Sequence, residues 1–271
     1  MNIYQDTTRF YKKAWTEKKI IGTSLLKRNI YAIKMGEGSP VGIAVYGIHG
    51  REWITAKLAT EHYARGAVGT VWLIPLANPD GALLSQQGIA SAQGSPYSRF
   101  LSAYSNGELR LWKANARGVD LNVNFDADWG KGEKNVRMRG AENFIGESPF
   151  SEPETKALRD FTLAISPDYT VSFHTKGGEI YWYFGQSQED CMRDFRIGRS
   201  LAKATGYPLR QSKGSVGGYK DWCIQQMRIP AYTVEVGSDT ATHPLGYTAY
   251  LEIRKRCGGA LNALALGVLK G

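Results

Sequence analysis

The alternation of short apolar runs with longer amphipathic segments most constrains what this chain can fold into. Strand-like runs occupy residues 30–34, 41–47, 70–77, 168–174, 179–184 and 231–237. Helix-like segments occupy residues 52–65, 151–165, 189–205, 217–228 and 247–269. This alternation predicts an α/β fold with a mixed, mostly parallel twisted sheet flanked by helices. Because 271 residues with 42% hydrophobic content can fill one large core, we expect a single domain over residues 1–271.

Local signals refine two parts of this prediction. The sequence "SEPET" favours a helix with Ser151 as N-cap, Pro153 in the first turn and Glu154 completing a capping box. Residues 78–148 are rich in Gly, Asn, Ser and Arg, and we expect them to be mainly irregular. A long ordered loop region of this kind usually has a function.

Composition limits the kinds of partner that the protein can bind and the places where it can act. The net charge is +9, but the basic residues are spread along the chain, so we expect anionic polymers or acidic substrates rather than nucleic acid. No stretch reaches the roughly 18 apolar residues of a membrane span. Three cysteines, Cys191, Cys223 and Cys257, indicate no disulfide framework. Residues 1–20 are polar and predict no export signal, hence a cytoplasmic protein, although a role at the cell wall, in a spore or in phage lysis is also open.

Polar side chains follow the apolar runs where strands of an α/β sheet end. "VYGIHGRE" ends in His49 and Glu52, and "YTVSFHTKGG" contains His174. Ligand sites of open α/β sheets lie beyond the carboxyl ends of strands, so these residues can converge there. Two imidazoles and one carboxylate form a ligand set that zinc enzymes use, with a fourth position left open. The remaining histidines, His62 and His243, lie in a polar helical segment and a loop, and we expect neither to bind metal.

Glu235 lies inside the apolar run "AYTVEVG". A carboxylate in such a run is costly to bury unless hydrogen bonds or a cation compensate it. A buried salt bridge is one explanation. The other is a general base beside a zinc-activated water.

The sequence resembles the zinc carboxypeptidase family of the carboxypeptidase A type. The motifs that carry the resemblance follow in the family's order: "HGRE", "NPDG", "RLWKANARGVDLNVNF", "SEPET", "SFHTKGG", "GGYKDW" and "TVEVG". The resemblance implies one zinc ion bound by His49, Glu52 and His174. It also implies that Glu235 is the catalytic carboxylate.

Three departures from the family pattern concern the substrate. Digestive members carry an Asn-Arg pair that grips the free C-terminal carboxylate, whereas this chain keeps Asn122 and has Val123 in place of the arginine. Lys113 stands where the family has an oxyanion-stabilising arginine, and Lys213 stands at the position of the substrate-capping tyrosine. Removal of ordinary C-terminal residues is therefore not the expected activity.

These departures resemble the bacterial branch that cleaves peptidoglycan stem peptides between γ-D-glutamate and diaminopimelate, or Lys at that position. We expect muropeptide carboxylates to be bound by basic residues, together with Asn122; the candidates are Lys113, Arg117, Arg137, Arg139, Lys176 and Lys213. Three alternatives remain open: an ordinary metallocarboxypeptidase, a zinc deacylase of small N-acyl amino acids, and a catalytically silent module that binds wall polymer.

Overall fold

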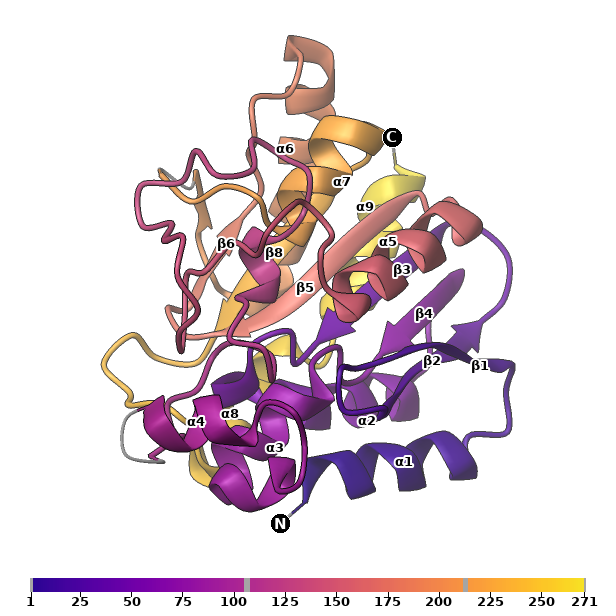
Figure 1. Ribbon diagram of the computed structural model, residues 1–271. Coiled ribbons are helices and arrows are strands. Elements are labelled where there is room, and N and C mark those ends of the chain that lie inside the picture. Colours follow the sequence, from indigo (N-terminus) through magenta and orange to yellow (C-terminus); the bar gives the residue numbers. More distant parts are fainter. Residues whose placement is uncertain (1, 105–107, 212–213, 271) are drawn as a thin grey trace.

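The fold is built around one eight-stranded mixed sheet (Figure 1). The structure, a computed structural model, describes residues 2–104, 108–211 and 214–270. The strand order is β1-β2-β4-β3-β5-β8-β6-β7, and the four pairs β3–β4, β3–β5, β5–β8 and β6–β7 are parallel. The strands are β1 (Lys18–Thr23), β2 (Asn29–Gly36), β3 (Val41–Tyr46), β4 (Thr70–Ile74), β5 (Tyr169–Thr175), β6 (Glu179–Tyr181), β7 (Leu209–Arg210) and β8 (Ala231–Val236). The predicted α/β fold is confirmed.

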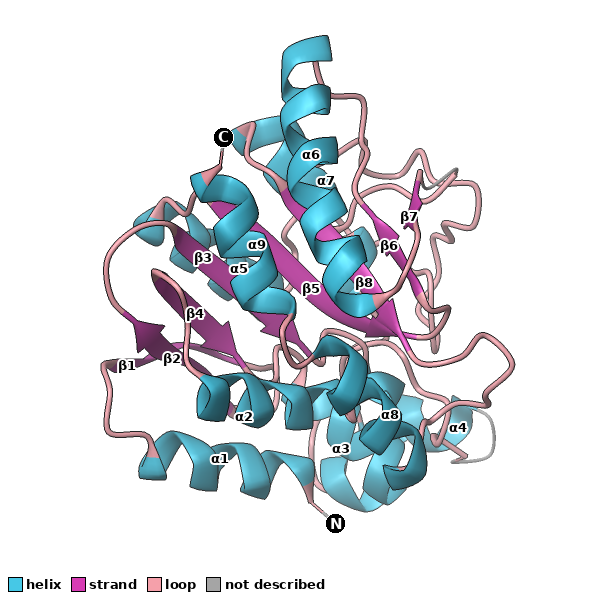
Figure 2. Ribbon diagram, turned by 180° about the vertical axis from the view of Figure 1, so that it is seen from behind, coloured by secondary structure: helices cyan, strands magenta, loops and turns pink. Residues whose placement is uncertain are grey.

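Helices cover both faces of this sheet. They are α1 (Ile3–Lys13), α2 (Thr55–Arg65), α3 (Pro79–Gln87), α4 (Ser98–Ala103), α5 (Pro153–Ile165), α6 (Gln188–Thr205), α7 (Tyr219–Met227), α8 (Tyr247–Cys257) and α9 (Ala260–Leu269). Figure 2 shows α6 and α9 side by side across one face, and α5 lies on the opposite face in Figure 1. No helix in the described part of the chain is both long and apolar enough to cross a membrane.

Alternate side chains of the central strands fill two separate cores. In β3, Ala44 and Tyr46 pack in the core beneath α2, α6 and α9, while Ile43 and Val45 pack in the core beneath α5 and α7. This two-residue period is the geometry of a strand buried on both faces. The central strands β3, β5 and β8 are therefore held rigidly, and their carboxyl ends lie at the same edge of the sheet.

The structure corrects the predicted start of the helix at residue 151. Helix α5 begins at Pro153 with Glu152 as N-cap, and no side chain caps it. Ser151 Oγ donates instead to Glu152 Oε1 at 2.8 Å, and the Glu154 carboxylate accepts from the Leu25 backbone N–H at 3.2 Å. The capping box is absent because both of its side chains bind neighbouring groups.

Other predicted element boundaries are also wrong. The segment 247–269 forms two helices, since the glycine pair Gly258 and Gly259 separates α8 from α9 and Gly258 packs against Arg65. The strand predicted at 179–184 ends at Tyr181. Among its described residues the region 78–148 is mainly irregular, as predicted, although it contains α3 and α4. Asn78 caps α3 by accepting the Gly81 backbone N–H at 2.8 Å.

Candidate active site

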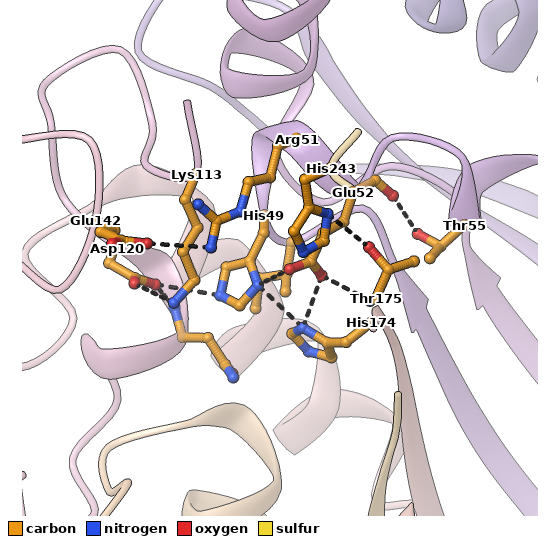
Figure 3. Close-up of polar contacts among 12 residues, drawn as sticks. His49, Arg51, Glu52, Thr55, Lys113, Asp120, Glu142, His174, Thr175 and His243 are labelled. Carbon is orange, nitrogen blue, oxygen red and sulfur yellow. Dashed lines mark hydrogen bonds and ion pairs between the residues drawn. The ribbon is translucent and has the colours of Figure 1, made fainter. Parts of the chain in front are cut away.

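Three predicted ligands meet at the carboxyl edge of the central strands (Figure 3). His49 follows β3, Glu52 ends the short 3₁₀ helix Gly50–Glu52, and His174 lies near the end of β5. All three side chains are buried. Within the described residues they are the one group of His, Cys, Asp and Glu side chains close enough to hold a metal ion.

The distances among these ligands fit a zinc ion. His49 Nδ1 lies 2.9 Å from Glu52 Oε1, and His174 Nδ1 lies 3.1 Å from both His49 Nδ1 and Glu52 Oε2. A tetrahedral zinc with Zn–N bonds near 2.0 Å places its ligand atoms roughly 3.3 Å apart. The two imidazole nitrogens and the carboxylate therefore surround one point, at which a cation can contact all three.

The turn that carries His49 and Glu52 depends on a glycine. A Cβ atom at Gly50 would lie 2.4 Å from the Gly81 carbonyl oxygen and 2.7 Å from that of Trp112. The Gly50 backbone N–H donates to the Lys113 carbonyl at 2.9 Å. Only glycine allows this close approach, which joins the ligand turn to α3 and to the segment that contains Lys113.

Asp120 supports the cluster from behind, and the sequence analysis missed it. Its Oδ1 lies 3.2 Å from His49 Nε2, on the side of the ring away from Glu52. Its backbone partners are the Asn122 and Asn143 N–H groups, each at 3.1 Å. A carboxylate in this position fixes the orientation and tautomer of a metal-binding histidine. Its position within the recognised motif "RLWKANARGVDLNVNF" was the available signal.

Lys113 forms an ion pair with the same carboxylate. Its Nζ lies 2.7 Å from Asp120 Oδ2. Burial opposes ionisation of Asp120, but the Lys113 ammonium and His49 hold the pKa of Asp120 well below its ordinary value. Burial also works against the charge of Lys113, yet Asp120 raises the pKa of this lysine. Lys113 is therefore a cation at the edge of the metal cluster.

Glu235 lies beside the ligands on the neighbouring strand. It is the register partner of His174 across the parallel pair β5–β8. Burial raises the pKa of Glu235 to about 7, although His174 acts in the opposite direction. A carboxyl group with a pKa near neutral pH is suited to take and release a proton.

A cavity of about 540 Å³ opens onto His49, Glu235 and Lys113. Asn122 and Val123 lie in its wall, and the Asn122 Oδ1 accepts the Tyr219 backbone N–H at 3.0 Å. The described residues that line it are His49, Arg51, Lys113, Asn122, Val123, Glu133, Lys134, Asn135, Glu142, Asn143, Tyr181, Gly214, Ser215, Gly218, Lys220, Asp221, Thr233 and Glu235. Arg51, Lys220 and Asp221 are lining residues that the sequence analysis did not name, although "HGRE" and "GGYKDW" contain them.

Four predicted substrate-binding cations lie outside this lining. Arg117 pairs with Glu152 at 3.4 Å, and exposed Arg139 pairs with Glu147 at 3.6 Å. The Arg137 guanidinium lies 5.3 Å from the centre of the Trp129 ring, and Lys176 donates to the Asp239 carbonyl. Their binding of substrate stays a prediction. Lys213 lies outside the described residues.

The two remaining histidines are not part of the ligand group. His62 Nε2 donates to the Cys257 carbonyl at 2.9 Å, and its Nδ1 accepts from the Tyr46 hydroxyl at 2.6 Å. His243 Nδ1 lies 3.3 Å from Thr175 Oγ1, next to the cluster. That neither histidine binds the metal stays a prediction.

A two-histidine, one-carboxylate cluster with an open side is the ligand set of zinc hydrolases. The fold and the site together define this class, because the cluster faces a cavity large enough for a small substrate.

Comparisons with known proteins narrow the class to a family. Residues 68–252 match the family model described as zinc carboxypeptidase, and this range includes His174 and Glu235. The γ-D-glutamyl-L-diamino acid endopeptidase 1 of Lysinibacillus sphaericus is 32% identical over an alignment of 245 residues, and the alignment covers 83% of this chain and 61% of that protein. The chain belongs to the zinc carboxypeptidase family and is a zinc metallopeptidase.

Two further matches support this assignment. Murein peptide amidase A of Escherichia coli is 36% identical over an alignment of 142 residues, and the alignment covers 48% of this chain and 54% of that protein. The structure of bovine thrombin-activatable fibrinolysis inhibitor superposes with a TM-score of 0.77 at 21% identity, covering 98% of this chain and 94% of that one. The last likeness shows a carboxypeptidase fold.

Proposed function

We propose that the protein hydrolyses peptidoglycan stem peptides at the bond between γ-D-glutamate and the following diamino acid. The observation that carries the proposal is Val123, which lines the catalytic cavity next to Asn122 and is 7% exposed. Carboxypeptidases of the family that the sequence resembles have an arginine at this position. Without a guanidinium there, this wall has lost the bidentate partner of a terminal carboxylate.

The printed names of two relatives support the same substrate class. One is a γ-D-glutamyl-L-diamino acid endopeptidase and the other a murein peptide amidase. This chain spans 61% and 54% of the lengths of these two relatives. We therefore assign their activity to this chain only as a proposal.

His49, Glu52 and His174 would hold the zinc ion, and Asp120 would keep the His49 ring in its binding orientation. When bound, zinc supplies a Lewis acid that activates water and polarises the scissile carbonyl. Glu235 takes the proton of the attacking water and delivers it to the leaving amine. Its raised pKa suits both transfers.

Lys113 provides positive charge where the scissile carbonyl gains negative charge. Its Nζ has three hydrogens, and the described partner is Asp120, so a donor remains for substrate. A fixed ammonium in a partly closed cavity stabilises a developing oxyanion. Lys113 is 17% exposed at its side chain, so this charge is shielded from bulk water.

Mass spectrometry of products from a substrate panel tests the proposal. The panel contains a muramyl tripeptide, the corresponding tetrapeptide and a hippuryl dipeptide of the kind that carboxypeptidases cleave. We expect cleavage of both stem peptides between D-glutamate and the diamino acid, with little action on the hippuryl substrate. Faster turnover of the hippuryl substrate would identify an ordinary carboxypeptidase. Action on small N-acyl amino acids alone would identify a deacylase.

A further inference from the structure

A second cavity, of about 510 Å³, lies between helices α1, α2 and α8. Figure 2 shows these three helices at the same end of the molecule as the N-terminus. Among the described residues, this cavity shares no lining residue with the catalytic cavity. Its volume is within the range of cavities that hold small ligands. It is therefore a candidate binding site separate from the hydrolytic centre.

The lining of this second cavity combines an apolar floor with positive charge. Ile3, Ala56 and Tyr250 belong to the buried part of the lining, and each is at most 9% exposed. The described lining also contains four cations and one carboxylate, which are Arg9, Lys13, Lys57, Arg254 and Asp6. An anionic ligand with small apolar groups matches such a surface in both charge and polarity.

Two of the four cations are free to bind a ligand. The two guanidinium groups are paired, that of Arg9 with Asp6 at 3.1 Å and that of Arg254 with Glu61 at 2.7 Å. The two lysines of the lining have no carboxylate within ion-pair distance in the part of the chain that the structure describes. An ammonium has three hydrogens to donate. Both lysines can therefore pair with carboxylates that a ligand supplies.

An aromatic pair forms the wall of the cavity on α8. Tyr247 is 58% exposed, and its ring centre lies 5.8 Å from that of Tyr250. The Tyr250 hydroxyl donates to the Lys57 carbonyl at 3.3 Å and so joins α8 to α2. This contact holds the wall in place, and the exposed ring of Tyr247 offers apolar contact area at the entrance.

We propose that this cavity binds a second stem peptide of the wall polymer, apart from the one that is cleaved. A stem peptide carries carboxylates on γ-D-glutamate and on the diamino acid, and its alanine residues carry methyl groups. Lys13 and Lys57 bind the carboxylates, and the apolar floor accepts a methyl group. The inference rests on the proposed function and adds a second site for the same class of substrate.

A second site of this kind favours polymeric substrate over free peptide. Stem peptides recur along the polymer, so one molecule can occupy both sites, and the second binding event is then intramolecular. Lys57 belongs to α2, which begins just after the metal ligand Glu52, so the two sites are joined by one helix. A free peptide gains nothing from the second site when it is bound for cleavage. The lysines should therefore matter for peptidoglycan alone.

The kinetic test compares insoluble peptidoglycan with a soluble stem tetrapeptide. The variant is the double substitution Lys13→Met and Lys57→Met. The control is Lys203→Met with Lys255→Met, which removes two exposed lysines of α6 and α8 outside the cavity and gives the same net charge. On peptidoglycan, kcat/KM of the variant should fall roughly tenfold, as expected for two ion pairs at a partly exposed site. On the tetrapeptide, variant, control and wild type should agree.

Sedimentation with peptidoglycan measures the binding directly. The zinc-loaded Glu235→Gln protein is used, with and without the two groove substitutions, so that the polymer stays intact. Peptidoglycan is supplied as isolated and after removal of its phosphate-containing polymers. Binding should persist on the stripped material, weaken roughly tenfold with Lys13→Met and Lys57→Met, and be displaced by excess soluble tetrapeptide.

An equal loss on both substrates in the double variant would show a structural role for the two lysines and overturn the inference. A double variant that matches the control on peptidoglycan would overturn it too. Lysine-dependent binding that disappears with the phosphate polymers would mean that the cavity binds phosphate groups instead. In these cases cleavage of the tetrapeptide by wild type leaves the proposed function standing. If wild type cleaves neither substrate, the proposed function fails and the second site fails with it.

Discussion

The two carboxylate oxygens of Asp120 join Lys113 to His49, at 2.7 Å from Lys113 Nζ and 3.2 Å from His49 Nε2. Asp120→Asn removes the charge that holds the His49 ring, so zinc affinity should fall roughly ten- to hundredfold. Competition with a chromophoric chelator measures this affinity directly. Asp126→Asn, on an exposed carboxylate of the same segment, is the control. Unchanged zinc affinity in Asp120→Asn would show that the carboxylate does not support the metal site.

We expect Val123 to disfavour substrates with a free C-terminal carboxylate. Val123→Arg should raise kcat/KM on a hippuryl dipeptide by roughly a hundredfold, because a guanidinium beside Asn122 restores a charged partner for that carboxylate. Val123→Leu adds bulk without charge and should give no gain. Steady-state kinetics on the three proteins checks this. A gain in the leucine variant alone would show that shape, rather than charge, controls this wall.

The buried His62 makes the fold sensitive to acid. Burial lowers the pKa of His62 from 6.5 to about 4. Above pH 6.5 both folded and unfolded chains carry a neutral imidazole, so stability is intact there. Between pH 6.5 and 4 the unfolded chain binds a proton that the folded chain does not. The free energy of unfolding then falls by about 1.4 kcal/mol per pH unit.

Urea unfolding of metal-free protein at about pH 7.5 and pH 5 tests this dependence. His62→Gln cannot titrate, so the stability gap between wild type and this variant should narrow by about 2 kcal/mol at the lower pH. Metal-free samples keep zinc release out of the comparison. A gap that stays constant would mean that His62 is not the group responsible.

The sequence predicted those parts of the site that local pattern determines. His49, Glu52, His174 and Glu235 each interrupt or follow an apolar strand-like run, and the structure brings the three predicted ligands together. The central strands were predictable for the same reason, since apolar runs of this length are buried on both faces.

The remaining features depend on contacts between distant segments. The sequence around Asp120 is typical of a turn, and only the fold shows that this carboxylate contacts His49. A lysine at the start of a helix is typical of the surface, but the structure shows that Lys220 is buried in the wall of the cavity. Ser151 fits the cap pattern, but its hydroxyl donates to Glu152. Sequence pattern cannot weigh such competing partners, because they come from elsewhere in the chain.

Turnover and zinc content of Glu235→Gln, measured on the same sample, show whether zinc and Glu235 together form the hydrolytic centre. Glutamine keeps the shape but cannot accept the proton of water, so turnover of the stem tetrapeptide should fall by roughly a thousandfold. The variant should still bind one zinc per chain and unfold at the wild-type temperature. Wild-type turnover in a zinc-loaded, folded Glu235→Gln would show that Glu235 is not the catalytic carboxylate.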